Sequence, residues 1–182
     1  MSKTLNLVNT AANEYADLLV AADTLINRTN NRRASNNAST NKISITNYHA
    51  SNTTKVSLYI EQNPVSVLAA LYAASGDSTI THTSNTSIVA GMEVEGTGIP
   101  ASAIVDSVTS PTAFELSANT TILSGGAGNT LTLVGKHYII SNVDIPPGAT
   151  LVLDDKITFN VTTHKLVIHK NLANTRITVI ID

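Results

Sequence analysis

The last third of the chain is a succession of short runs rich in Val, Ile and Thr, which Asn, Gly, Pro and Asp repeatedly interrupt. Such punctuation is typical of β-strands separated by turns. The runs are KHYIISNV, ATLVLDD, KITFNVTTHKLVIHK and TRITVIID. IPPGA at residues 145–149 predicts a tight turn, because proline fixes φ and glycine relaxes the backbone, and Asp154-Asp155 predicts another. The pattern restricts this region to short strands joined by turns.

Alternation of apolar and polar residues predicts which side chains face a core. In the last third, the predicted inward residues are Val167, Ile177, Val179 and Ile181. Upstream, NKISITNYHA and TTKVSLYIEQ alternate in the same way on either side of the turn-like SNTT. This pair predicts a half-buried antiparallel hairpin. Its inward side chains are Ile43, Ile45, Val56, Leu58 and Ile60.

Two segments favour helices. NPVSVLAALYAASG has apolar residues at helical spacing, with Asn63 as a cap, Pro64 in the first turn and Gly76 at the end. NEYADLLVAADTLINRT also places apolar residues on one helical face, although its Leu-Leu-Val run is compatible with a strand. The sequence therefore predicts one or two short helices in an otherwise β-rich chain.

The segment 76–134 is a string of short strand-like runs separated by Gly, Pro, Ser and Asn, and it predicts a small inserted β-module. We expect three parts: an N-terminal segment 1–41, a β-sandwich formed by 42–75 and 135–182, and the inserted module 76–134. The predicted fold class is mainly β, a jelly-roll-like antiparallel β-sandwich carrying this module.

Charged residues make up 13% of the 182 residues and the net charge is −2, whereas globular domains typically contain about 25% charged residues. This balance argues against a nucleic-acid partner. The basic cluster Arg28, Arg32 and Arg33 is expected to be a solvated loop. The absence of cysteine excludes disulfides and thiolate metal sites. No apolar run approaches 18 residues, so we expect no membrane span.

The stretch GMEVEGTGIP, residues 91–100, places three glycines within eight residues and invites comparison with phosphate-binding loops. A dinucleotide fingerprint needs G-x-G-x-x-G before a helix, and a P-loop needs Gly-Lys-Ser/Thr. Here strand-like residues follow Gly96 and Gly98, and the lysine is missing. We therefore expect Gly91, Gly96 and Gly98 to permit positive φ at tight bends.

Other candidates for chemistry are equally weak. His164 and His169 lie five residues apart in a predicted strand, so they point to opposite faces and cannot share a metal unless the strand bulges. Glu93 and Glu95 share a strand face and are compatible with Ca²⁺ binding or acid/base work, but a hydrated edge strand is the commoner outcome. The prediction is a protein that is not an enzyme, with no catalytic, cofactor-binding or metal-binding residues.

Two parts of the sequence resemble structural proteins of tailed-bacteriophage virions. GMEVEGTGIPASAIVDSVTSPTAFELSANTT is similar to a small immunoglobulin-like β-module that opens with G-M-x-V-x-G-x-G-I-P and continues to an F-x-L-S strand. The stretches around it are similar to a β-sandwich of tail, neck or head-exterior proteins. The matching residues of the module are Gly91, Met92, Val94, Gly96, Gly98, Ile99, Pro100, Phe114, Leu116 and Ser117. Those of the sandwich are Ile45, Asn47, Val56, Leu58, Tyr59, Ile60, Tyr138, Ile139, Asn142, Val143, Ile145, Pro146, Gly148, Leu151 and Leu153.

The resemblance covers residues 42–182 and implies a virion structural protein that assembles by contacts with capsid, neck or tail proteins. It favours a neck or tail position and a homo-oligomer, without nucleic-acid or membrane partners. The alternatives are a capsid decoration protein on the head exterior and a receptor- or glycan-binding module. In simpler relatives the two halves of the sandwich adjoin, whereas here the predicted helix and the module separate them. The first forty residues match no known pattern and are a candidate anchor.

Overall fold

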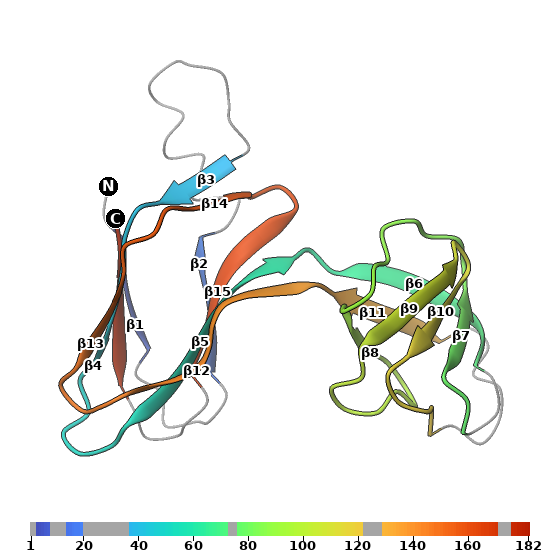
Figure 1. Cartoon of the computed structure of the whole chain (residues 1–182), viewed down its shortest axis with the longest axis horizontal. Helices are drawn as coiled ribbons and strands as arrows, with labels where there is room; N and C mark the ends of the chain where they lie inside the picture. Colours follow the sequence, from blue (N-terminus) through green and yellow to red (C-terminus); the bar gives the residue numbers. More distant parts are fainter. Residues whose placement is uncertain (1–2, 8–13, 20–36, 73–75, 122–128, 171–175) are drawn as a thin grey trace. The chain divides into compact units, whose positions relative to one another are not determined.

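The structure, a computed structural model, describes residues 3–7, 14–19, 37–72, 76–121, 129–170 and 176–182. All regular elements of these ranges are β-strands (Figure 1). Neighbouring strands pair antiparallel wherever their register is defined. The mainly β, antiparallel fold class is therefore confirmed. The predicted short helices are wrong for the described residues.

The chain forms two compact units. Unit 1 combines Met1–Glu61 with His137–Asp182, and unit 2 is Gln62–Lys136, which is inserted into the sequence of unit 1. These bounds differ from the predicted ones, because the segment 62–75 belongs to unit 2 and not to the sandwich. The predicted separate segment 1–41 also differs, because its described strands are part of the sheets of unit 1.

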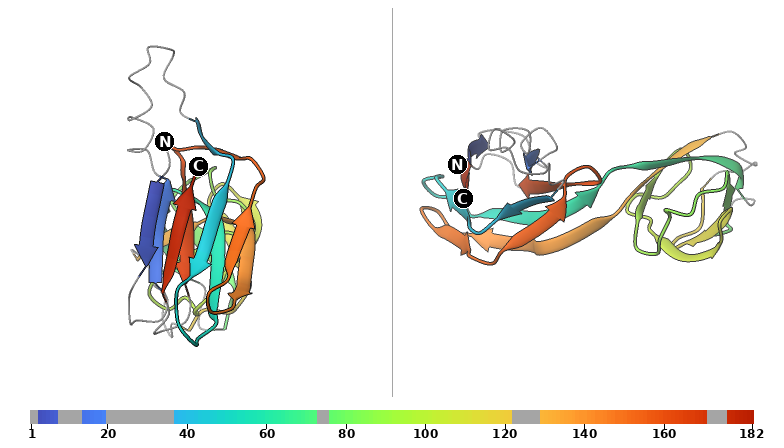
Figure 2. Two further views of the ribbon diagram at one scale, coloured as in Figure 1. Left: turned by 90° about the vertical axis from the view of Figure 1, so that its left-hand side faces the viewer. Right: turned by 90° about the horizontal axis from the view of Figure 1, so that it is seen from above.

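Unit 1 contains two four-stranded sheets and a two-stranded one. The first has the order β1 (Lys3–Leu7), β16 (Ile177–Ile181), β4 (Ile43–Asn47), β13 (Thr150–Leu153), and the left-hand view of Figure 2 shows it face-on. The second has the order β12 (Lys136–Ile145), β5 (Thr54–Gln62), β15 (His164–Lys170), β2 (Glu14–Leu19). The short pair is β14 (Ile157–Asn160) with β3 (Asn37–Thr40).

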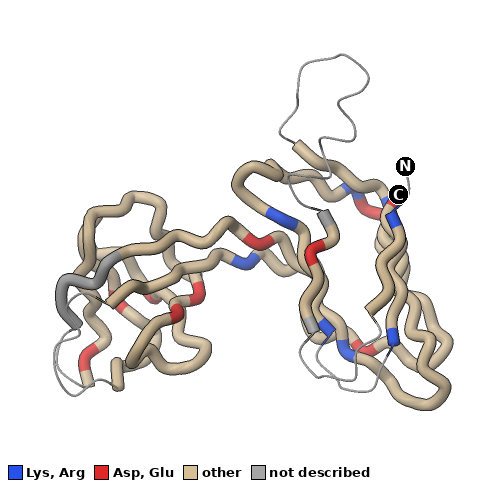
Figure 3. The backbone as a smooth tube through the Cα atoms, turned by 180° about the vertical axis from the view of Figure 1, so that it is seen from behind, with Lys and Arg blue, Asp and Glu red and all other residues tan. Residues whose placement is uncertain are grey.

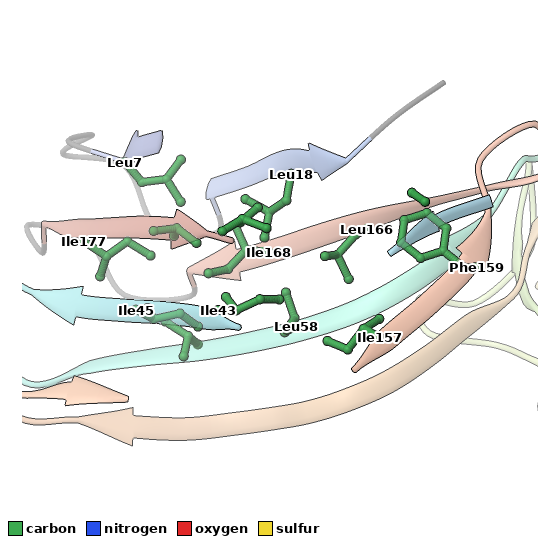
Figure 4. Close-up of a cluster of buried hydrophobic side chains, with 14 of the residues drawn as sticks. Leu7, Leu18, Ile43, Ile45, Leu58, Ile157, Phe159, Leu166, Ile168 and Ile177 are labelled. Carbon is green, nitrogen blue, oxygen red and sulfur yellow. The ribbon is translucent and has the colours of Figure 1, made fainter. Parts of the chain in front are cut away.

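One hydrophobic cluster takes side chains from all three sheets of unit 1 (Figure 4). Ile43 and Ile45 come from the first sheet, Leu58 and Leu166 from the second and Phe159 from the short pair, and all are buried. Full burial of one such side chain contributes about 2 kcal/mol. The predicted sandwich and its jelly-roll-like arrangement stay predictions.

Two predictions about these strands are wrong, one about which strands pair and one about which side chain faces the core. β4 and β5 are strands, as expected, but they do not form a hairpin, because β4 pairs with β13 and β16 while β5 lies in the other sheet. Alternation of apolar and polar residues predicts which side chains are buried, and the inward side chains of β4 and β5 are indeed buried in the same core. It does not predict which strands pair. Val167 is buried but lies outside the core cluster, because its neighbours Leu166 and Ile168 face the core.

Asn47 fixes the two turns at one end of unit 1. Its side chain is fully buried, and its Nδ2 donates hydrogen bonds to the carbonyl oxygens of Asn52, at 2.8 Å, and Ile145, at 2.9 Å. Its Oδ1 accepts from the His49 N–H at 3.0 Å. The predicted turn at 145–149 is confirmed here, with Gly148 at a φ of 71°.

Unit 2 contains one six-stranded sheet. Its order is β8 (Glu93–Glu95), β11 (Thr130–Val134), β6 (Val65–Tyr72), β7 (Thr79–His82), β10 (Ala113–Leu116), β9 (Val105–Ser110). A bridge between Glu93 and Ile104 joins the β8 edge to the residue that precedes β9, so the sheet closes on itself. Met92, Phe114 and Leu131 are fully buried in its separate core.

The segments predicted as helices form strands β6 and β2. β6 pairs with β11 on one side and β7 on the other, so a central position in the sheet overrides the helical spacing of its apolar residues. β2 pairs with β15 at the sheet edge, with an irregularity between Leu166 and Val167. The remainder of the second predicted helix, beyond Leu19, lies outside the described residues.

Candidate functional site

The glycines of GMEVEGTGIP shape the backbone of unit 2. Gly91 and Gly98 have φ values of 89° and 75°, as predicted. The N–H of Gly91 donates to the carbonyl of Val105 at 2.8 Å, and the carbonyl of Gly98 accepts from the Thr121 N–H at 2.9 Å. A phosphate-binding loop directs its N–H groups at the ligand, whereas these backbone groups bond within the protein.

Gly96 does not have the positive φ that was expected of it. It is required for the close approach of its loop to a neighbouring strand. A Cβ at this position would lie 2.4 Å from Cδ2 of Leu131 and 3.3 Å from the carbonyl oxygen of Thr130. Leu131 is fully buried in the core of unit 2. The absent side chain therefore lets the loop approach β11 closely.

The carboxylates of unit 2 bind groups of the protein itself. Glu93 accepts a hydrogen bond from Nζ of Lys136 at 2.5 Å, so the suggested Glu93–Glu95 acid pair has one member in an ion pair. Glu115 accepts from the hydroxyls of Ser78, at 2.8 Å, and Thr79, at 3.0 Å. A hydrogen bond from the N–H of Thr79 lowers the pKa of Asp77. Through these contacts the acidic groups stabilise the turns and strands of unit 2.

The two candidate histidines of β15 do not come together. His169 stacks on Tyr15, with ring centroids 4.2 Å apart and planes at 7°. His164 lies near His137 instead, with centroids 6.5 Å apart. Within the described ranges no group of three or more His, Asp or Glu side chains could hold a metal ion.

Two further expectations concern partners. The basic cluster Arg28, Arg32 and Arg33 lies outside the described residues, so its surroundings are not defined. In the described part of the chain, no helix is long and apolar enough to cross a membrane. Charged residues occupy few positions along the described backbone (Figure 3).

The clearest polar surface of unit 1 lies on the outward face of the sheet β12-β5-β15-β2, which we call the tyrosine face. It is lined by Tyr15, Asp17, Lys55, Ser57, Tyr59, Glu61, Tyr138, Asp144, Lys165, Val167 and His169. Tyr15 and Tyr138 stand on the two edge strands and are 56% and 51% exposed. Tyr59 on β5 is 1% exposed and packs on Tyr138, with ring centroids 5.1 Å apart. Three of the five tyrosines of the chain thus share one face.

Ion pairs engage all the charged residues of the tyrosine face, which are two lysines and three carboxylates. Nζ of Lys165 lies 3.1 Å from Asp17 Oδ1 and 3.0 Å from Glu61 Oε1. Partial burial lowers the pKa of Lys165, but the hydrogen bonds and charges of these carboxylates outweigh it and raise the pKa above its usual value. Nζ of Lys55 lies 3.0 Å from Asp144 Oδ1.

A second surface of unit 1 is the outward face of the sheet β1-β16-β4-β13, on which the strands themselves place no charged side chain, and we call it the threonine face. The strand registers arrange it as two rows of four side chains. The rows are Thr150, Thr46, Thr178, Asn6 and Val152, Ser44, Ile180, Thr4. Within the first row, Thr46 and Thr150 share a hydrogen bond of 2.9 Å and Thr178 donates to Asn6.

Sequence reasoning missed both faces, since neither coincides with a motif. The alternation of Leu58 and Tyr59 was sufficient to place Tyr59 outward on its own strand. The strands that carry Tyr15 and Tyr138 are far away in the sequence, and only the order of strands in the sheet brings the three tyrosines together.

Comparisons of the chain with protein-family models, curated proteins and solved structures find no match. The resemblance to virion proteins therefore stays a prediction from sequence patterns.

Proposed function

We propose that this chain is a non-enzymatic structural protein of a tailed-bacteriophage virion, which assembles through protein–protein contacts as a neck or tail component. The observation that carries the proposal is the pair of sequence patterns typical of such proteins. In this chain the first pattern supplies buried strands and turns of unit 2, including Met92, Val94 and Phe114. The second supplies buried strands of unit 1, including Ile45 and Leu58.

The threonine face is the surface best suited to these contacts. Transfer of charges out of water is costly, and none of the eight side chains in the two rows of this face is charged. Its hydroxyl and amide groups can form hydrogen bonds with a partner, while Val152 and Ile180, 47% and 37% exposed, add apolar area. Repeated copies that dock in this way would form the symmetric assembly expected of a virion component.

A lysine at the centre of the threonine face tests this proposal. Ser44 is flanked by Val152 and Ile180 in its row, so Ser44→Lys introduces a charge that a docked partner would have to bury. We expect at least a tenfold loss of incorporation into purified particles, measured by quantitative mass spectrometry. Ser107→Lys is the matched control, because Ser107 is an exposed serine on a strand of unit 2.

Circular dichroism establishes that both variants fold. Equal incorporation of Ser44→Lys, Ser107→Lys and the unmodified chain would exclude the threonine face as the docking surface. Antibody labelling of particles, viewed by electron microscopy, separates a neck or tail position from decoration of the head. Label on the head exterior would replace the neck or tail assignment with the decoration alternative.

A further inference from the structure

The tyrosine face has two exposed aromatic rings at opposite edges and a closed floor between them. Tyr15 on β2 and Tyr138 on β12 are separated by three inter-strand spacings, about 14 Å across the sheet. Between them, Tyr59 and Val167 are 1% and 2% exposed. Among its described side chains, the face therefore presents two separate exposed rings, of which Tyr15 stacks on His169 with one side, and no continuous exposed apolar patch.

The polar groups between the rings are already ordered. Lys165 is held by Asp17 and Glu61 at about equal distances, 3.1 and 3.0 Å. Each carboxylate has a second oxygen that can accept a hydrogen bond from a ligand hydroxyl, since an ionised carboxylate offers about four acceptor sites. A charged ligand would have to compete with these internal pairs, whereas a neutral, hydroxyl-rich ligand can bond to them without breaking any.

We infer that the tyrosine face binds a neutral oligosaccharide, with Tyr15 and Tyr138 packing against sugar rings and the Asp17–Lys165–Glu61 group bonding to hydroxyls between them. Tyrosine suits this use because its ring offers an apolar surface and a polar tip. This activity is additional to the proposed structural function and does not depend on it.

A protein partner is the competing interpretation. Protein interfaces place most of their binding energy in a central, fully desolvated cluster of aromatic and Arg side chains. On the tyrosine face the exposed rings stand at the edges, and the centre is occupied by paired charges. The arrangement therefore favours the oligosaccharide.

Affinity gel electrophoresis of the full chain tests the inference, with dextran, mannan, laminarin and galactan as neutral polymers and hyaluronan as a charged one. We expect retardation by at least one neutral polymer and weaker retardation by hyaluronan. Tyr15→Ala and Tyr138→Ala should each weaken the binding of that polymer at least tenfold. Tyr48→Ala is the matched control, because Tyr48 is 62% exposed and does not contribute to the tyrosine face.

Three results would overturn the inference: no retardation by any neutral polymer, stronger retardation by hyaluronan, or equal losses in the Tyr48→Ala control. Tyr15→Phe, which retains the ring, should preserve most of the binding, and an unchanged circular dichroism spectrum of Tyr15→Ala shows that its loss of binding is not a loss of fold. Incorporation into particles is measured on the same variants. Loss of incorporation with intact polymer binding would instead assign the face to a protein partner.

Discussion

Replacement of Gly96 by alanine tests whether this glycine exists for close packing. The new Cβ would lie 2.4 Å from Leu131 Cδ2 and 3.3 Å from the carbonyl oxygen of Thr130. Leu131 is 0% exposed, so its methyl group cannot move out of the way into solvent. Overpacking of a core costs about 1–3 kcal/mol, and we expect Gly96→Ala to destabilise unit 2 by about 2 kcal/mol.

Hydrogen–deuterium exchange read by mass spectrometry measures this loss in one unit at a time. A change of about 2 kcal/mol corresponds to roughly 30-fold faster exchange of amides that open with the whole unit. We expect this acceleration in peptides that contain β8 and β11. Peptides from unit 1 should keep their rates and act as an internal control.

Two more variants separate packing from backbone strain. Gly91 has a φ of 89°, but a Cβ there meets no atom within 4 Å, so Gly91→Ala should cost only the strain of about 1–2 kcal/mol. Leu131→Val shortens the side chain that Gly96→Ala would strike, so the double variant should lose less stability than the two single losses added together. Unchanged exchange in Gly96→Ala, or simple additivity with Leu131→Val, would refute the packing argument.

Two other predictions concern unit 1. Asn47→Asp keeps the size of the side chain but replaces the donor to Asn52 and Ile145 with an acceptor, so we expect a loss of about 3 kcal/mol in urea unfolding; an unchanged midpoint contradicts this. Lys165→Met should cost at most about 1 kcal/mol at neutral pH. Because the folded pKa of Lys165 is raised above 10.5, this stabilisation is complete below pH 10.5 and is lost as the pH rises through the folded value. A stability difference between Lys165→Met and the unmodified chain that persists unchanged above this pH range would contradict the assignment of the stabilisation to the charged lysine.

The sequence was sufficient to predict most strands of unit 1 and the insertion of unit 2, because turn residues and alternation are local signals. β6 was not predictable in this way. Its residues VSVLAALY form a short continuous apolar run, which periodicity alone does not separate from a buried helix, and Pro64 is compatible with the start of either element. Pairing with β11 and β7 decides the outcome.

The sequence also did not predict which strands pair with one another. The alternation in β4 and β5 correctly predicted Ile43, Ile45 and Leu58 as core residues, but it did not reveal that the strands lie in different sheets. The tyrosine face was hidden for the same reason. Tyr15, Tyr59 and Tyr138 become neighbours only through the strand order of one sheet, which depends on contacts between distant parts of the chain.

The central claim is that this chain is a component of an assembled phage particle. Quantitative mass spectrometry of gradient-purified particles, made with the unmodified chain present, tests it directly. The account predicts the chain in intact tailed particles, at a fixed number of copies relative to the major capsid protein. Its recovery solely in the soluble fraction of infected cells, with none in the particles, would contradict the account.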